Sequence, residues 1–104
     1  MVRGEIFRLR LAPTRGREQA GVCHGVIVQA DELLALSTVL VAPTCRSAPP
    51  RSFRPTIRIG DQDTRILVEQ LRVIDVARLG DSVGRLSAQE IHALDAALED
   101  VLGL

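Results

Sequence analysis

The sequence contains no lysine, no tryptophan and no tyrosine, and Phe7 and Phe53 are its only phenylalanines. A protein that holds single-stranded nucleic acid by stacking needs several aromatic side chains, so stacking surfaces are almost absent here. Because lysine is missing, all 13 basic residues are arginines. Their planar guanidinium groups suit two-point contacts to phosphate or carboxylate groups.

Cysteine and histidine are also scarce: the chain has Cys23, Cys45, His24 and His92. No C-x-x-C pair occurs, which argues against a zinc site, and two cysteines are too few for a disulfide scaffold. We therefore expect no metal and no other cofactor. In a reducing compartment, both cysteines should remain thiols packed near the core.

Long apolar runs are absent, since none approaches the roughly 20 residues that span a bilayer. The first ten residues, with Arg3, Glu5, Arg8 and Arg10, lack the apolar segment of a signal peptide. These absences predict a cytoplasmic protein that does not contact a membrane. The 104 residues are 46% hydrophobic and 25% charged, which is typical of a single globular domain over residues 1–104.

The formal net charge is zero, but charge is segregated along the chain. Residues 1–58 carry nine arginines and four acidic residues, whereas residues 59–104 carry four arginines and nine acidic residues. A basic half beside an acidic half favours a polyanion or an acidic peptide as partner.

Alternating and β-branched apolar residues predict a series of short strands. These strands are expected at 5–11, 22–29, 37–44, 56–59, 64–68, 69–75 and 82–86. Pro13 and Pro43 should end the first and third strands, because proline cannot donate to a ladder. Residues 31–36 can form a helical turn or a broad loop, and 75–79 should form a short turn ended by Gly80.

The end of the chain changes to helical periodicity. Ser87 and Glu90 have the spacing of a capping box, and apolar residues then recur every three or four positions, so we expect a helix over 88–102. The whole pattern predicts a mainly β fold with a C-terminal α-helix, in which a small, strongly bent antiparallel barrel is closed on one face. Loops 12–21 and 45–55 hold most of the excess arginine. If they converge, they form a basic groove with Thr44 at its floor.

Several segments of the sequence resemble the MazF/PemK toxin family, in the same order along the chain. They are residues 3–6, 13–22, 41–44, 69–75, 84–87 and 94–98. The combination of Gly-x-Glu-Gln-x-Gly at 16–21 with Glu-Gln-x-Arg at 69–72 is quite specific.

This resemblance implies a MazF/CcdB-like plasmid-maintenance-toxin fold that forms a homodimer. It also implies the toxin of a bacterial toxin-antitoxin pair, which regulates growth by cutting single-stranded mRNA, rRNA or tRNA at short sequence motifs. Toxins of this family need no metal ion, use the ribose 2′-hydroxyl as nucleophile and leave a cyclic phosphate. The cognate antitoxin contributes an acidic, disordered tail that lies across the same groove.

The family's catalytic threonine falls on Thr44, whose hydroxyl at a strand end can hydrogen-bond the scissile phosphate. The family's catalytic arginine, in Gly-x-Arg-Pro-Val, falls on Cys23, and the proline on His24. One such charged donor contributes roughly 3 to 4 kcal/mol to the transition state, and a neutral thiol cannot replace it.

Three interpretations of this departure are open. His24 can act as general acid or base, although strand alternation directs it away from the face of Cys23. Alternatively, Arg15, Arg17 or Arg46 supplies the charge from a loop. Thirdly, the chain is a catalytically impaired pseudo-toxin that only binds RNA or sequesters an antitoxin peptide. The predicted RNA-binding residues are Arg15, Arg17, Glu18, Gln19, Arg46, Arg51 and Arg54.

Overall fold

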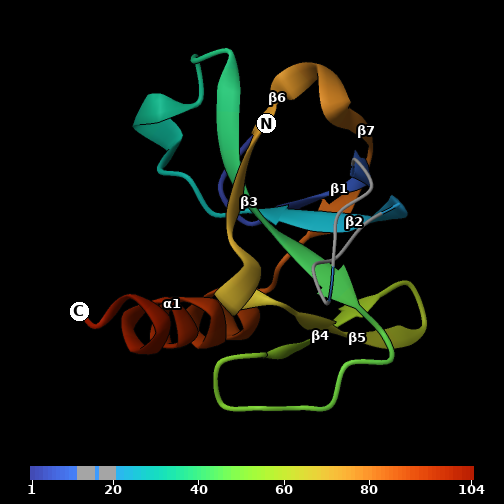
Figure 1. The fold of residues 1–104 in the computed structure, drawn as a ribbon, viewed down its shortest axis with the longest axis vertical. Helices are drawn as coiled ribbons and strands as arrows, with labels where there is room; N and C mark the ends of the chain where they lie inside the picture. The colour runs from blue at the N-terminus through green and yellow to red at the C-terminus, as the bar shows by residue number, and fades with distance from the viewer. Residues whose placement is uncertain (12–15, 17–20) are drawn as a thin grey trace.

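A computed structural model describes residues 1–11, 16 and 21–104. In these ranges the chain forms seven strands, three single 3-10 turns and one helix (Figure 1). The strands are β1 (Glu5–Leu11), β2 (Gly21–Ile27), β3 (Thr38–Cys45), β4 (Thr56–Ile59), β5 (Gln62–Ile66), β6 (Arg72–Asp75) and β7 (Leu79–Arg85). The turns are η1 (Asp31–Leu33), η2 (Val68–Gln70) and η3 (Val76–Arg78), and the helix is α1 (Ala88–Leu102).

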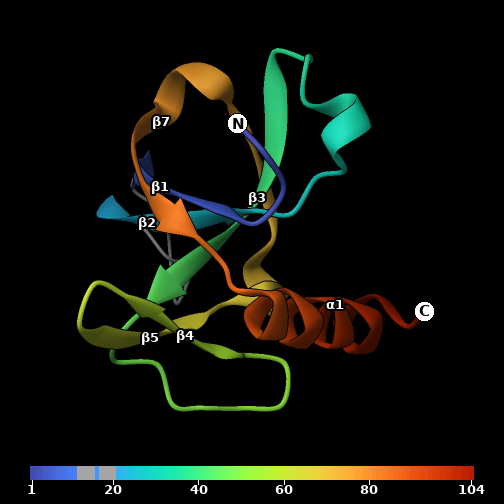
Figure 2. The same cartoon turned by 180° about the vertical axis from the view of Figure 1, so that it is seen from behind.

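The strands form one curled antiparallel sheet. Their order is β4-β5-β3-β2-β1-β7, and β6 pairs with the first half of β3. Strand β3 then pairs with β2 over Val41–Pro43 and with β5 at Thr44–Cys45. Figures 1 and 2 show the resulting half-barrel, with α1 beside the β4–β5 hairpin. The predicted mainly β fold with a bent antiparallel sheet and a C-terminal helix is therefore confirmed.

The two faces of the sheet pack against different apolar clusters. Val26 and Ala42 lie in the cluster that contains Leu94 of α1, whereas Ile27 and Val41 lie in a second cluster. Since neighbouring residues of a strand point to opposite faces, the even positions of β2 and β3 face the helix side and the odd positions face the other. Whether a residue number is even or odd therefore decides which side chains of β2 and β3 share a face.

Helix α1 begins and ends where its local signals predict. The Glu90 amide donates to Ser87 Oγ at 3.1 Å, and the Ser87 amide donates to Glu90 Oε1 at 2.8 Å, which completes the capping box. Gly103 stops the helix with a φ of 70°, a conformation that favours glycine. Within the described residues, no helix is long and apolar enough to cross a membrane.

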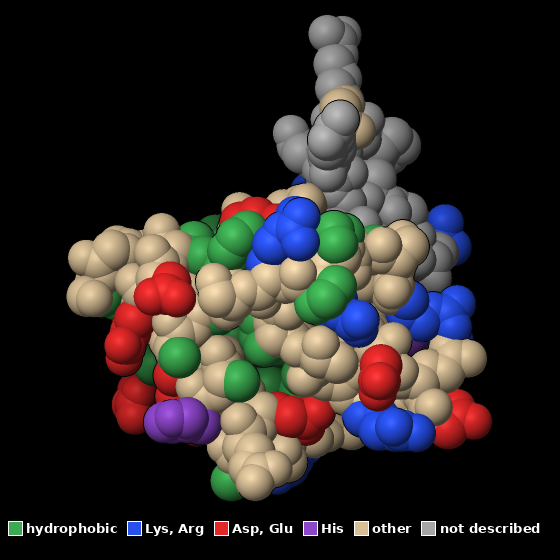
Figure 3. All heavy atoms as spheres, turned by 90° about the horizontal axis from the view of Figure 1, so that it is seen from below, with side chains coloured by type: hydrophobic (Ala, Val, Ile, Leu, Met, Phe, Trp, Pro, Cys, Tyr) green, Lys and Arg blue, Asp and Glu red, His purple; other side chains and the backbone are tan. Residues whose placement is uncertain are grey.

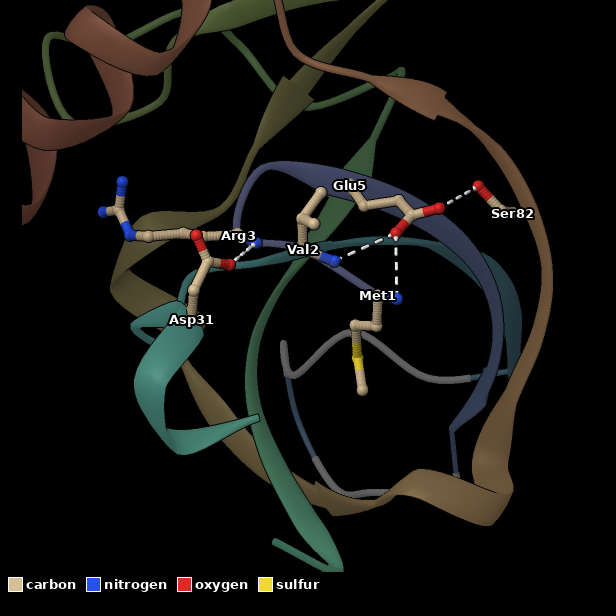
Figure 4. A network of polar contacts seen from close by, with 6 residues as sticks. All are labelled: Met1, Val2, Arg3, Glu5, Asp31 and Ser82. Carbon is tan, nitrogen blue, oxygen red and sulfur yellow. Dashed lines mark hydrogen bonds and ion pairs between the residues drawn. The ribbon is translucent and has the colours of Figure 1, made fainter. Parts of the chain in front are cut away.

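The carboxylate of Glu5 fastens the start of the chain to β7 (Figure 4). It accepts hydrogen bonds from the Ser82 hydroxyl at 2.6 Å and from the Val2 amide at 3.1 Å, and the Met1 amino group lies 3.8 Å away. The Ser82 hydrogen bond is the largest influence and lowers the pKa of Glu5, against the opposing effect of burial.

Arg3 joins the same segment to three other parts of the fold. Its amide donates to Asp31 Oδ1 at 2.7 Å, as drawn in Figure 4. Its guanidinium donates to the Val28 carbonyl at 3.0 Å and to Asp95 Oδ1 of α1 at 2.7 Å. The N-terminal segment, the end of β2, η1 and the helix are thereby held together.

Three predicted details between residues 68 and 86 are wrong. Glu69 and Gln70 form the turn η2 instead of a strand, because Val68 is fully buried and the Gln70 amide bonds the Leu67 carbonyl. Gly80 lies inside β7 and does not end a helical turn. A Cβ at Gly80 would lie 3.0 Å from the Arg8 carbonyl, so glycine allows β7 to approach β1. Strand β7 consequently starts at residue 79, earlier than predicted.

Gly25 of β2 lies in close contact with the side chain of Leu9 in β1. A Cβ at this position would lie 2.3 Å from Cδ1 of Leu9, whose side chain is only 2% exposed. Gly25→Ala should therefore lower the free energy of unfolding by about 1 to 3 kcal/mol through overpacking. Urea unfolding of Gly25→Ala, Leu9→Val and the double variant measures the coupling. We expect the loss in free energy of unfolding in the double variant to be smaller than the sum of the losses in the two single variants. A loss equal to that sum would contradict this packing.

Candidate functional site

An open pocket of about 460 Å³ lies where β1, β2 and β3 meet the β4–β5 hairpin. Its described lining residues are Arg8, Cys23, His24, Thr44, Cys45, Arg46, Ile59, Gln62 and Thr64. Among them are two arginines and no carboxylate, so the described wall favours an anionic ligand.

Three of these side chains form a row across neighbouring strands. Arg8 of β1 is the direct partner of His24 in β2. The pairing of Gly25 with Pro43 places Thr44 beside His24, and the Thr44 hydroxyl donates to the His24 carbonyl at 3.2 Å. Because directly opposed residues of antiparallel strands share a face, Arg8, His24 and Thr44 lie on the same side of the sheet. Thr44 is 4% exposed and forms part of the pocket floor.

Cys23 belongs to the other face of β2. It is the partner of Leu9 and packs against the cluster that contains Leu9 and Ile27. Cys23 still borders the pocket, but strand parity separates its side chain from the row of Arg8, His24 and Thr44. The position to which the resemblance assigns the arginine therefore lies on the face opposite to Thr44, whereas His24 shares the face of Thr44.

The charges around His24 favour its neutral form. Burial lowers the pKa of the imidazole, and the positive charges of Arg8 and Arg46 lower it further. Arg46 donates a hydrogen bond to Gln62 of the hairpin, which anchors its guanidinium at the pocket. At neutral pH the site therefore combines two fixed cations with an imidazole able to accept a proton.

Of the three predicted arginines in loop 45–55, only Arg46 lines the pocket. Arg54 instead binds Glu69, with an Nη2–Oε2 distance of 2.5 Å, and lies 5.5 Å from the centroid of the Phe53 ring. The hydrogen bond to Glu69 raises the pKa of Arg54. Arg51 donates to the neighbouring Pro50 carbonyl. RNA binding by Arg51 and Arg54 stays a prediction, and the structure does not bring them into the pocket.

Cys45 follows Thr44 at the pocket edge. Burial would raise the pKa of its thiol, but hydrogen bonds from the Ser47 hydroxyl, the Ser47 amide and the Ala48 amide, together with the charge of Arg54, lower it overall. The sulfur and the Ser47 oxygen are 3.3 Å apart. This arrangement stabilises a thiolate beside the site.

Four predicted RNA-binding residues, Arg15, Arg17, Glu18 and Gln19, lie outside the described residues. Conversely, the structure adds Arg8, Gln62 and Thr64, which sequence reasoning missed. Arg8 and Thr64 lay in predicted strands and Gln62 lay between two of them, and alternation alone does not tell which strands will be neighbours. Within the described chain, no group of three or more histidine, cysteine, aspartate or glutamate residues can hold a metal ion.

Charge is also segregated in space. Figure 3 views the molecule from the side of α1 and the β4–β5 hairpin; acidic side chains gather at the helix end on the left, and arginines lie mostly toward the right. Helix α1 contributes Glu90, Asp95, Glu99 and Asp100 and no arginine. The helix thus carries acidic side chains, whereas the arginines of the described pocket lining come from β1 and from the segment after β3.

The fold and the site define a class of small proteins with a curled antiparallel sheet and an open cationic pocket. The described residues of this chain contain no cluster that could hold a metal ion. Sequence comparison gives the family: the chain belongs to the PemK-like, MazF-like toxins of type II toxin-antitoxin systems, whose family model matches residues 2–102. The chain is 33% identical to the Mycobacterium tuberculosis protein Rv3098A over 106 residues, covering 100% of this chain and 99% of that protein. It is 32% identical to the endoribonuclease MazF of Staphylococcus epidermidis over 109 residues, covering 98% of this chain and 91% of that protein.

Solved structures agree on the fold. MazF from Deinococcus radiodurans superposes with a TM-score of 0.86 at 18% identity, covering 100% of this chain and 97% of that chain. An endoribonuclease from a mycobacterial species, solved in complex with its cognate antitoxin, gives a TM-score of 0.86 at 17% identity, covering 100% of this chain and 96% of that chain. The curled sheet with a closing helix is therefore shared with MazF structures.

Proposed function

We propose that this protein is the toxin of a type II toxin-antitoxin pair and cuts single-stranded RNA as a metal-independent endoribonuclease. The observation that carries the proposal is the row of Arg8, His24 and Thr44 at the floor of a cationic pocket. Membership of the toxin family and the relative named endoribonuclease MazF support it. Like the family, the protein would act in the cytoplasm as a homodimer.

The proposed reaction is the one that the family resemblance implies. The ribose 2′-oxygen attacks the adjacent phosphorus while its proton passes to a base, and the bond from phosphorus to the 5′-oxygen breaks. The products are a 2′,3′-cyclic phosphate and a 5′-hydroxyl, so no water is consumed. Guanidinium groups stabilise the charge that develops on the phosphate oxygens. The pocket's positive charge also suits the second partner, a cognate antitoxin with an acidic, disordered tail that would compete with RNA.

Purified protein incubated with single-stranded RNA in excess EDTA tests this function. We expect fragments that end in a cyclic phosphate, and inhibition by the acidic tail of the antitoxin. RNA that remains intact at every enzyme concentration would contradict the endoribonuclease proposal.

A pseudo-toxin that only binds is the second candidate, and the observation that favours it is Cys23 at the position of the family's arginine. Cys23→Arg separates the two candidates. Because Cys23 faces the Leu9 cluster, we expect the new arginine to change the cleavage rate less than about tenfold, which is about 1.4 kcal/mol. An inert wild type that gains cleavage by orders of magnitude in Cys23→Arg would instead identify a pseudo-toxin. Cys23→Ser serves as the control for loss of the thiol.

A further inference from the structure

One hydroxyl group in the pocket has no hydrogen-bond partner in the described part of the chain. Thr64 of β5 is only 3% exposed, and its Oγ1 is buried without a donor or acceptor among the described residues. Leaving a buried polar group unpaired costs free energy, so such groups normally have a partner. Thr64 lines the pocket, so a ligand oxygen bound there is a candidate partner for its hydroxyl.

Arg8 supplies a second unused donor at the same pocket. Its guanidinium makes no salt bridge to any carboxylate of the described residues, whereas Arg3, Arg54 and Arg58 each do. Its charge acts on His24, its direct cross-strand partner. Arg46, the other pocket cation, is already anchored by Gln62. Arg8 is therefore the pocket cation whose guanidinium no described carboxylate binds, so its fork suits an anionic ligand.

We propose that Arg8 and Thr64 bind the oxygens of the scissile phosphate and that His24 accepts the proton of the attacking 2′-hydroxyl. The inference rests on the endoribonuclease function proposed above and assigns its site residues. The 2′-oxygen forms the new bond to phosphorus, its proton moves to the imidazole, and the imidazolium returns a proton to the departing 5′-oxygen. Arg8 of β1 then provides the permanent charge that Cys23 cannot provide.

The surroundings of His24 fit this role. The described ionisable groups that line the pocket with it are Arg8 from β1, Arg46 after β3, and the thiols of Cys23 and Cys45. Burial and the two arginines keep the imidazole neutral at pH values where a free histidine begins to protonate. His24 thus enters the reaction ready to take up a proton.

Two substitutions and one matched control test the assignment by cleavage rate and thermal midpoint. Arg8→Gln and Thr64→Val should each lower the cleavage rate about 10²-fold, the effect of losing one donor to a developing oxyanion. Thr64→Val should also raise the thermal midpoint, because it removes an unpaired hydroxyl at nearly constant volume. Arg10→Gln, two residues along β1 and outside the described pocket lining, should change the rate less than about threefold.

Proton NMR titration provides a readout that does not require cleavage. In Arg8→Gln, the pKa of His24 should rise toward its ordinary value, and the acid limb of the pH–rate profile should move to higher pH with it. Arg10→Gln should leave the His24 titration close to wild type. His92, which is exposed on α1, supplies a second histidine signal as internal reference.

The outcomes separate this inference from the proposed function. Wild-type protein that cuts RNA, with Arg8→Gln and Thr64→Val equally active, overturns the assignment and leaves the endoribonuclease intact. A Thr64→Val variant that loses thermal stability, or an Arg10→Gln variant as impaired as Arg8→Gln, also overturns it. Wild-type protein that cuts no RNA overturns the function itself, whatever the His24 titration shows.

Discussion

Thr44→Ala should lower the rate of RNA cleavage by two to three orders of magnitude. The Thr44 hydroxyl donates to the His24 carbonyl at 3.2 Å, so it is held on the pocket floor in one row with His24 and Arg8. Loss of one donor aimed at a reacting phosphate oxygen typically costs about 10² to 10³ in rate. Single-turnover cleavage of a short RNA measures the chemical step directly.

Thr44→Ser is the matched control for this substitution. It keeps the hydroxyl and removes a methyl group, so we expect the cleavage rate to stay within about tenfold of wild type, which is about 1.4 kcal/mol of activation free energy. A thermal scan of each variant excludes unfolding as the cause. If Thr44→Ala and Thr44→Ser were equally impaired, the side chain would act through packing and not through its hydroxyl.

The largest loss of stability should come from Leu94→Ala. Leu94 of α1 is fully buried in the cluster with Ile6, Val26 and Ala42, and it joins the helix to the sheet. Truncating a buried leucine to alanine costs about 2 to 5 kcal/mol, because transfer free energy is lost and a cavity is left. For a chain of this size, each kcal/mol shifts the thermal midpoint by roughly 4 to 8 °C. A fall of about 10 °C or more is therefore expected.

Leu102→Ala is the control for Leu94→Ala. Leu102 lies in the same helix but is 55% exposed. Its truncation should therefore change the free energy of unfolding by no more than about 0.5 kcal/mol, and the thermal midpoint should shift correspondingly little. Unfolding followed by circular dichroism gives both values. Equal losses in the two variants would contradict the packing of α1 against the sheet through Leu94.

Local signals account for what could be predicted from sequence. The alternation of β1 and the capping box of α1 act over a few residues, and both elements form where those patterns indicate. The strand pattern and the arginine-rich loops predicted Thr44 at the floor of a groove, whereas its catalytic role was predicted from family resemblance. Its place on the pocket floor depends on β3 exchanging one partner strand for another.

Long-range pairing accounts for what could not be predicted. Nothing near Arg8 in the sequence indicates that it will oppose His24, since strand register is set by turns and by burial of distant residues. Thr64 is likewise exceptional only because packing buries its hydroxyl without a partner in the described chain. Arg54 looked available in an arginine-rich loop, but Glu69, 15 residues away, binds it.

The bond between Arg3 and Asp95 spans 92 residues of sequence. On the ribosome, all the described pocket residues precede residue 65, and so they emerge before the helix that covers the apolar face of their sheet. A nascent chain lacking Leu94 would expose that face, and contacts of such long separation form slowly. These pocket residues should therefore acquire their stable fold only after α1 has been synthesised and has packed against the sheet.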